Sequence, residues 1–258
     1  MKKDVDAAKK MKDEGNSSFQ KKWYKQAHTY YSISIVKSPR NNDTLAYSIA
    51  NRSACNYYLG EAMNCIADIN IALKSGYPPQ LHYKLFERLA KSYVLLKDKP
   101  NALKAVRQAK DSLEKQRSKF EKDKFKSAME KLVKLGIVIN NNDEVIQETI
   151  ELAEEGPQPR TPKLANKSHK KIKEFSNQIK VEHNESVGRH VRADKPIKAG
   201  DTLVVEEPMD AILYPNRYGT NCNYCFCKLK NVVPCPNCAG VGFCSAECRD
   251  IALESYHK

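Results

Sequence analysis

Apolar residues in the first 140 positions recur at three- and four-residue spacing, and strand-like alternation is scarce. This spacing predicts a series of helices. The pattern changes in 137–185, where Asn, Pro, Ser and charged residues dominate, so we interpret this range as a linker with short helices at 143–155 and 168–179. Short apolar runs return at Val204–Val205 and 211–215, and predict short strands.

A 34-residue period underlies the helical part of the chain. Gly15, Ala27, Tyr31 and Pro39 occupy relative positions 8, 20, 24 and 32 of a helix–turn–helix unit. Small residues let paired helices pack closely, the aromatic ring fills the space between them, and proline ends the second helix. These positions resemble the tetratricopeptide repeat.

Two further units complete the predicted repeat stack. One spans 43–77 with its turn at Gly60, and the next spans 80–113 with Pro100 opening its second helix. A polar, Lys-rich helix over 114–136 is expected to cap the stack, because terminal repeats need a solvated outer face. We therefore assign 1–136 to tetratricopeptide repeats with a capping helix. Four residues of this range are expected in the core: Cys55, Cys65, Trp23 and Tyr24.

Charge and hydropathy exclude several classes of protein. The chain carries a formal net charge of +13, and residues 1–140 account for the whole excess, with 28 Lys+Arg against 14 Asp+Glu. Its N-terminus lacks the apolar stretch of a signal peptide, and no run approaches the ~18 apolar residues of a membrane helix. We therefore expect neither a secreted protein nor a membrane partner. The basic runs 117–126 and 167–173 raise nucleic acid as an alternative partner, but without a recognition motif a capping helix and a linker are favoured.

Cysteine is concentrated near the C-terminus, where seven of the nine residues fall between Cys222 and Cys248. Two CxxC pairs, a CxxxC and a trailing histidine supply soft sulfur and borderline nitrogen ligands, which suit tetrahedral zinc. Oxidised or incidental cysteines are the alternative, which the spacing and the missing export signal disfavour. The candidate ligands are Cys222, Cys225, Cys235, Cys238, Cys244, Cys248 and His257.

The order of these residues resembles the MYND zinc finger, which holds two zinc ions with interleaved ligands. The resemblance implies that Cys222, Cys225, Cys244 and Cys248 bind the first zinc. It implies that Cys235, Cys238 and His257 bind the second, together with a cysteine about four residues after the histidine. The chain ends one residue after His257, so we expect an incomplete finger over 222–258, a second zinc site lacking one ligand, and a C-terminally truncated chain. Cys227 lies outside the pattern and is interpreted as a spare thiol.

The segment 186–218 resembles the start of a SET methyltransferase domain, with Gly188-Arg189, a turn at Gly200-Asp201 and a strand ending at Pro208. A SET start interrupted by a MYND finger and preceded by tetratricopeptide repeats resembles one branch of the SET and MYND lysine methyltransferases, the fourth member of the vertebrate series. That family implies S-adenosylmethionine as a cofactor contacted by Gly188, Arg189 and His190. His190 replaces the usual glycine, and an ordinary strand-entry turn is the alternative.

The repeats also resemble a subclass of tetratricopeptide proteins that binds peptides in a groove. One tetratricopeptide subclass clamps the C-terminal carboxylates of heat-shock chaperones ending in Glu-Glu-Val-Asp, through Lys-x-x-x-Asn, Asn-Arg-Ser/Ala-Ala and Lys-x-x-x-Arg. Five residues match: Lys12, Asn16, Asn51, Lys84 and Arg88. An i,i+4 pair places both side chains on one helical face, and the basic charge of this half would steer an acidic tail. The alternative is a solvated basic face with asparagines that tie neighbouring helices.

The expected fold is mainly α: a tetratricopeptide-type stack, a linker, a partial β-rich SET segment and a MYND finger. The expected function is that of a truncated protein-lysine methyltransferase with a chaperone-binding groove and a protein substrate, inactive alone because the family's later cofactor and tyrosine motifs are missing. The alternative is a non-enzymatic adaptor that binds chaperone tails through the repeats and proline-containing peptides through the finger. The family and the clamp imply both cytoplasm and nucleus.

Overall fold

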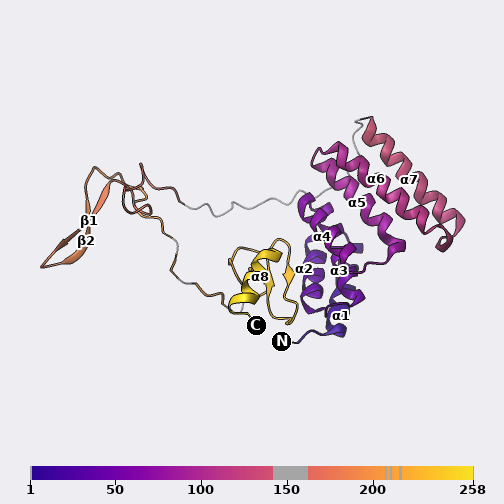
Figure 1. Cartoon of the computed structure of the whole chain (residues 1–258), viewed down its shortest axis with the longest axis horizontal. Coiled ribbons are helices and arrows are strands. Elements are labelled where there is room, and N and C mark those ends of the chain that lie inside the picture. Colours follow the sequence, from indigo (N-terminus) through magenta and orange to yellow (C-terminus); the bar gives the residue numbers. More distant parts are fainter. Residues whose placement is uncertain (1, 142–161, 207, 210, 215–216, 258) are drawn as a thin grey trace. The chain divides into compact units, whose positions relative to one another are not determined.

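The computed structural model describes residues 2–141, 162–206, 208–209, 211–214 and 217–257. Two compact units divide the chain (Figure 1). The first combines the N-terminal helical part with the C-terminal segment from Leu213, and the second spans Glu154–Ile212. The helix expected at 143–155 lies outside the described residues.

Consecutive helices pack side by side in the first unit, as the repeat period predicts (Figure 1). Short 3-10 turns precede the fifth and seventh helices, at Pro79–Leu81 and Arg117–Lys119. The mainly α architecture is therefore confirmed. The helices are α1 (Val5–Gln20), α2 (Tyr24–Lys37), α3 (Asp43–Tyr58), α4 (Ala62–Lys74), α5 (His82–Leu95), α6 (Lys99–Lys115) and α7 (Lys122–Asn140).

The helix ends follow local sequence signals. The side chains of Asp4, Asn42 and Asp98 cap α1, α3 and α6 by accepting hydrogen bonds from main-chain N–H groups of the first turns. Pro39 follows the end of α2 by two residues, and Gly60 turns the chain between α3 and α4 with a φ of +74°. These helix boundaries are therefore marked by residues local to each end.

Helix pairing depends on the small and aromatic positions of the repeat. A Cβ at Gly15 would lie 2.6 Å from Cε1 of Tyr31, so only glycine lets that ring pack against α1. Ala27, Cys55 and Cys65 are fully buried, as expected for small core residues. Trp23 is 54 % exposed, so its expected place in the core was wrong. Trp23 is the N-cap residue of α2, and the Lys21 ammonium lies 5.0 Å from the centroid of its ring.

The capping helix α7 begins at Lys122, because α6 continues to Lys115 and a 3-10 turn follows. Its Leu132 packs against Leu113 of α6, next to Phe120 and Phe125. A polar helix with one apolar face therefore closes the stack.

The second unit is built around a hairpin of β1 (Ile179–Asn184) and β2 (Gly188–Ala193), paired antiparallel with Val181 opposite Val191. Strand β1 lies inside the range 137–185, which we interpreted as a linker. The strand was missed because its six residues give only a short alternation of apolar and polar positions. The helix expected at 168–179 was wrong. Ser168 instead pairs with Ser176 across a turn, because the basic run between them offers no apolar face to bury.

The turn at Lys198–Asp201 is confirmed, with Gly200 at a φ of +90°. Val204 forms a single bridge to Phe175, and residues 211–214 are not paired as a strand. Strands were expected at both places. Each run is too short to form a ladder with the described residues around it.

The C-terminal segment forms a small αβ element of the first unit. Strands β3 (Val233–Pro234) and β4 (Gly242–Phe243) pair antiparallel, and α8 (Ala246–Ser255) follows. Its core is small, built on Phe243, Val241 and Ala252 beside two buried cysteines. Among the described residues, no helix combines the length and apolar character needed to cross a membrane.

Candidate peptide groove and metal centre

Three of the five predicted clamp residues line one cavity of about 290 Å³ in the repeat stack. Asn16 comes from α1, Asn51 from α3 and Arg88 from α5, so the first helices of the three repeats converge there. Oδ1 of Asn16 accepts hydrogen bonds from the Tyr31 hydroxyl at 2.8 Å and from Nδ2 of Asn51 at 3.0 Å. Burial raises the pKa of Tyr31, so this hydroxyl remains a donor.

Arg88 is braced against α3. Its Nη1 donates to the Ala50 carbonyl at 3.0 Å and to Oγ of Ser53 at 2.7 Å. Because both bonds use Nη1, Nε and Nη2 are the donors that a bound carboxylate would take. The guanidinium is therefore held at a fixed place on the cavity wall.

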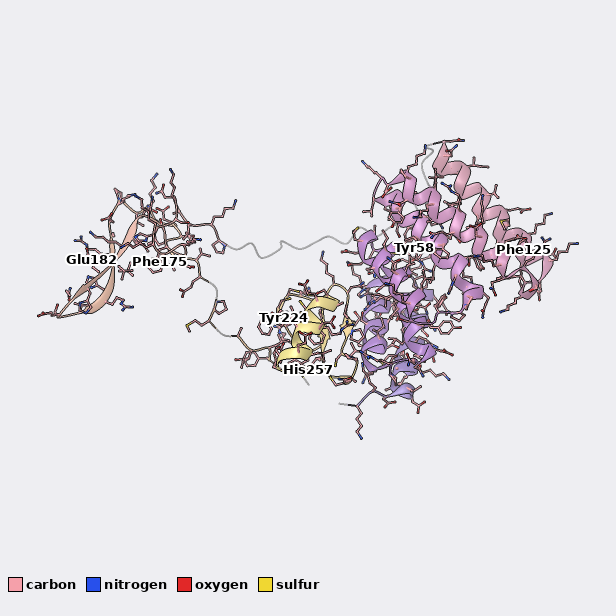
Figure 2. All side chains as sticks on the ribbon, viewed as in Figure 1. Tyr58, Phe125, Phe175, Glu182, Tyr224 and His257 are labelled. Carbon is pink, nitrogen blue, oxygen red and sulfur yellow. The ribbon has the colours of Figure 1, made fainter. Side chains whose placement is uncertain are left out.

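A larger cavity of about 930 Å³ adjoins the first and shares Arg88 with it. Lys84 lines this second cavity, with Lys91 from the same helix and Lys124 and Lys131 from the capping helix, against the acidic Glu87 and Asp123. The groove is thus basic overall. Its aromatic wall includes Tyr58, which Figure 2 labels within the repeats. The remaining aromatic residues of the wall are Phe19, Tyr57, Tyr83 and Phe120.

Glu87 in the groove lies between two lysines. Its Oε1 lies 3.1 Å from Nζ of Lys91 and 3.2 Å from Nζ of Lys131. Burial alone would raise the pKa of Glu87, but the two ammonium groups hold it below its ordinary value. Helix α7 was predicted only as a cap, and its contribution to the groove was missed because its lysines resemble an ordinary solvated face.

Lys12 is the clamp residue that the fold does not bring to either of these cavities. Its Nζ lies 3.5 Å from Oδ1 of the neighbouring Asp13. Four of the five expected clamp residues thus lie along the two adjoining cavities, and a peptide-binding role of all five stays a prediction.

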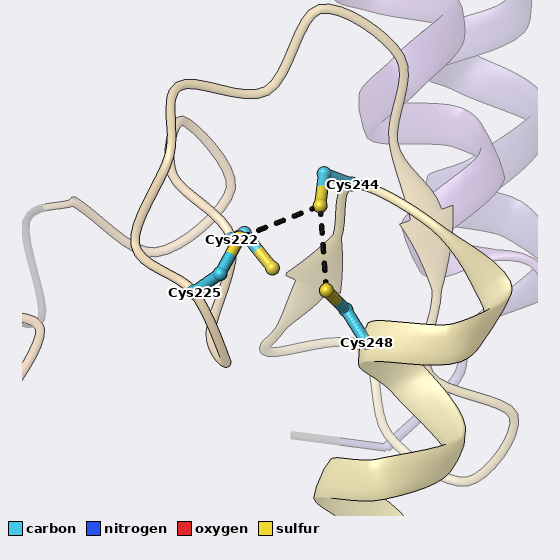
Figure 3. Close-up of side chains that lie close together, drawn as sticks. All are labelled: Cys222, Cys225, Cys244 and Cys248. Carbon is cyan, nitrogen blue, oxygen red and sulfur yellow. Dashed lines mark hydrogen bonds between the residues drawn. The ribbon is translucent and has the colours of Figure 1, made fainter.

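The first cysteine cluster joins the two ends of the C-terminal segment. Cys222 and Cys225 lie on one turn, Cys244 follows β4, and Cys248 lies in the first turn of α8 (Figure 3). The four sulfur atoms all lie within 4.8 Å of one another, with Cys225–Cys244 and Cys244–Cys248 Sγ distances of 3.5 Å.

Local geometry prepares these positions. Phe226 has a φ of +58°, and its N–H donates to the Cys222 carbonyl at 3.0 Å, which turns the chain back between the first two cysteines. Ser245 caps α8 by accepting from the Cys248 N–H at 3.1 Å.

The second cluster contains Cys235, Cys238 and His257, again with ligand atoms within 4.8 Å of one another. The main-chain N–H of His257 donates to the Ala252 carbonyl at 2.8 Å, which turns the chain back after α8. Nε2 of His257 then lies 3.4 Å from Sγ of Cys238, while the Asn237 N–H donates to Sγ of Cys235 at 3.3 Å.

Both clusters fit tetrahedral zinc. Zn–S bonds of about 2.3 Å separate two sulfur ligands by ~3.8 Å, and a sulfur–nitrogen pair by ~3.5 Å. The distances of 3.5 Å and 3.4 Å are close to these values. Cys227 was interpreted as a spare thiol, yet its Sγ lies 3.4 Å from that of Cys225, at the edge of the first cluster.

Residues Gly188, Arg189 and His190 lie together on β2 of the second unit. They pair with Asn184, His183 and Glu182 of β1, in that order. Gly188 has a φ of +73°, which explains glycine at the end of this hairpin turn. These three residues lie at the start of a strand. Their contact with a cofactor stays a prediction.

Comparison with known proteins identifies the C-terminal segment. Residues 222–258 match the family model described as MYND finger. This segment is a MYND finger. Both cysteine clusters of the chain belong to it.

Similarity to curated proteins extends over the rest of the chain. Protein-lysine N-methyltransferase SMYD4 of Pongo abelii is 27 % identical over 281 residues, and that of Homo sapiens is 28 % identical over 282 residues. Each match covers 99 % of this chain and 34 % of the relative, so the chain spans about a third of their length. The resemblance to the repeat-bearing branch of the SET and MYND methyltransferases is confirmed.

Among solved structures, the first tetratricopeptide domain of Spaghetti (RPAP3), bound to the HSP90 peptide SRMEEVD, is similar to the repeats. It is 17 % identical, with a TM-score of 0.41, and the match covers 54 % of this chain and 98 % of that domain.

Proposed function

We propose that the repeat groove binds the acidic C-terminal tail of a partner protein, with chaperone tails ending in Glu-Glu-Val-Asp as the ligand class. The proposal depends on one observation: Asn16, Asn51 and Arg88, from three different helices, line a single cavity that opens onto a basic groove. A terminal carboxylate has the charge that Arg88 and the basic groove would attract.

Each residue has a separate role in this proposal. The braced Arg88 donates to the terminal carboxylate, and the asparagine amides donate to carboxylate and main-chain oxygens. Lys84, which is exposed at the groove, attracts the acidic side chains that precede the terminus. Lys12 contributes at most to the general positive field, since it pairs with Asp13.

Peptide binding tests the proposal. Fluorescence anisotropy of a labelled peptide ending in Glu-Glu-Val-Asp is measured with the native chain, Lys84→Ala and the control Lys104→Ala, an exposed lysine of α6. Loss of one charged hydrogen bond costs ~1.5–3 kcal/mol, or about a 10- to 100-fold weaker Kd. We expect this loss for Lys84→Ala, and little change for Lys104→Ala.

The peptide itself supplies the sharper control. Amidation of its C-terminus removes the carboxylate that Arg88 is proposed to bind, so binding should weaken by at least the same factor. Equal binding of the amidated and free peptides would show that the groove is not a carboxylate clamp, and equal loss in both lysine variants would reduce it to a diffuse basic surface.

We further propose that the finger holds two zinc ions. The first is bound by Cys222, Cys225, Cys244 and Cys248. The second is bound by Cys235, Cys238 and His257, with a fourth ligand that the described residues do not supply. At the first site zinc would supply structure, since four thiolate ligands leave no open position for substrate. Metal analysis of the reduced, purified chain tests this, and a chain free of zinc would refute it.

For the whole protein, three times the length of this chain in its relatives, we propose lysine methylation of a protein substrate with S-adenosylmethionine. The groove would then recruit a chaperone or its client to the enzyme, in cytoplasm and nucleus. Methylation assays on the full-length protein, with and without Lys84→Ala, separate this role from that of an adaptor. A full-length protein that binds tails but transfers no methyl group would favour the adaptor, with proline-containing peptides as ligands of the finger.

A further inference from the structure

A buried ion pair in the second repeat lies where the finger meets the helices. Nε and Nη2 of Arg52 donate to the two carboxylate oxygens of Asp68 at 2.9 and 2.7 Å. The side chains are 2 % and 0 % exposed. Asn56 donates to the same carboxylate at 2.9 Å. Burial raises the pKa of Asp68, and Arg52 with the neighbouring amides opposes that rise.

Two residues of the finger complete this network. The Val232 carbonyl accepts from Nη1 of Arg52 at 3.1 Å, and Nδ2 of Asn231 donates to Oδ1 of Asp68 at 3.1 Å. They are 180 and 163 residues away in sequence from the partners that they satisfy. The finger therefore fills hydrogen-bonding positions of charged groups that water reaches poorly.

Asn231 touches three consecutive helices. Its Oδ1 accepts from Nδ2 of Asn56 on α3 at 3.2 Å and lies 3.4 Å from Nε2 of His28 on α2. Its Nδ2 also approaches the Asn64 carbonyl on α4 at 3.3 Å. A single amide thus uses both its donor and its acceptor against the repeat stack.

The packing around Asn231 agrees with this docking. Val232 is buried, and a Cβ at Gly242 would collide with its side chain, so the close approach of β4 to residue 232 needs glycine. The neighbouring Lys230 lies at the rim instead, 51 % exposed, with its Nζ 3.7 Å from Glu61. Lys230 therefore makes an exposed ion pair, while Val232, two positions later, makes a buried polar contact through its carbonyl.

We infer that Asn231 and Val232 form an intramolecular docking surface. Through it, the finger and helices α2–α4 of the repeat stack become one cooperative folding unit. The inference rests on the proposed zinc sites in one respect: metal that holds the finger folded also stabilises those helices. Linkage requires this, because a ligand of the folded unit stabilises everything that unfolds with it.

Hydrogen exchange of the 258-residue chain tests the inference, with and without a zinc chelator. In the native chain, chelation should raise exchange in peptides from α3 and α4 by about tenfold or more, and change α6 and α7 much less. If chelation frees the zinc and unfolds the finger while α3 and α4 keep their protection, the coupling is refuted.

A variant pair tests the docking independently of metal. Asn231→Ala should raise exchange in α3 and α4 without a chelator and lower Tm by about 3–10 °C, at unchanged zinc content. Lys230→Ala, one position away at the rim, should behave as the native chain does. Equal behaviour of the two variants would overturn the docking role of Asn231. If the purified chain holds no zinc, the metal sites fail, yet this pair still decides the docking.

Discussion

The repeat stack and the finger both present polar residues on a folded scaffold, but different interactions stabilise the two scaffolds. The stack buries an apolar core contributed by seven helices within the described residues, with Ile35, Ile69 and Leu85 almost fully enclosed. The finger has few core residues besides Phe243, and its chain is gathered around two clusters of cysteine and histidine side chains. The stack therefore depends on apolar area, and the proposed zinc sites would supply what the finger's small core lacks.

This difference explains where each part can carry function. A helical stack keeps its shape when surface residues change, so a groove can be built on its inner face. In the finger, the residues proposed to bind zinc would also hold the fold. Mutations should accordingly affect the finger most when they touch ligands, and the repeats most when they touch packing or buried charge.

The largest effect is expected from metal removal. Structural zinc contributes ~10–16 kcal/mol in small finger peptides, far more than the core of this finger can supply. Chelation should therefore unfold residues 222–257, as measured by loss of hydrogen-exchange protection. Cys244→Ser should release only the first zinc and His257→Ala only the second, counted by elemental analysis. Loss of both ions from either variant would show that the two sites bind as one.

The next effect concerns the buried ion pair. Asp68→Asn leaves the Arg52 guanidinium buried without its counter-charge, which typically costs 3–5 kcal/mol of unfolding free energy. Glu114→Gln removes an exposed pair with Arg117 and should cost less than about 1 kcal/mol. Denaturant unfolding of both variants checks this. Similar losses would mean that burial does not distinguish the two pairs.

A pH dependence should originate at His28. Burial, with Arg52 nearby, lowers the pKa of His28 to about 4. The unfolded chain, with an ordinary histidine pKa near 6.5, binds more protons below that pH. The contribution of His28 to the unfolding free energy is therefore intact above pH 6.5. It decreases by ~2–3 kcal/mol as the pH falls toward 4.

His28→Gln isolates this dependence, because glutamine can keep a hydrogen bond to Asn231 without titrating. Zinc ligands also take up protons at low pH, so the quantity to measure is the difference in unfolding free energy between the two proteins. Lys25, Glu61 and Lys230 line the same cavity and are present in both. Parallel pH profiles would assign the loss to other groups.

The smallest effect distinguishes two helical glycines. Gly15→Ala forces a Cβ to 2.6 Å from the Tyr31 ring and should cost about 1–3 kcal/mol. Gly136→Ala places its Cβ 3.4 Å from Val106, an ordinary contact, and should be neutral or stabilising by up to ~1 kcal/mol. Thermal unfolding compares them. A cost that is equal at both positions would place Tyr31 outside the packing of α1.

Much of the candidate site could be predicted because its signals are local. Cysteine spacing predicted the two groups of residues that lie together in the structure, and the i,i+4 pairs included Asn16 and Arg88, which line one cavity, since a turn or a helical face brings such residues together whatever lies around them. Their roles as ligands stay predictions. Lys12 shows the limit of this reasoning. It shares a helical face with Asn16, but only Asn16 of the two lines the cavity, because the neighbouring helices decide which part of that face is enclosed.

The repeat period and the two cysteine clusters follow from the sequence itself, because each depends on residues within one turn or one repeat. Only the tertiary structure decided that Asn231 meets Asp68, that Lys131 joins the groove, and that Trp23 stays exposed. These contacts join residues far apart in the chain or depend on how helices stack. Neither the period of a pattern nor a local propensity contains that information.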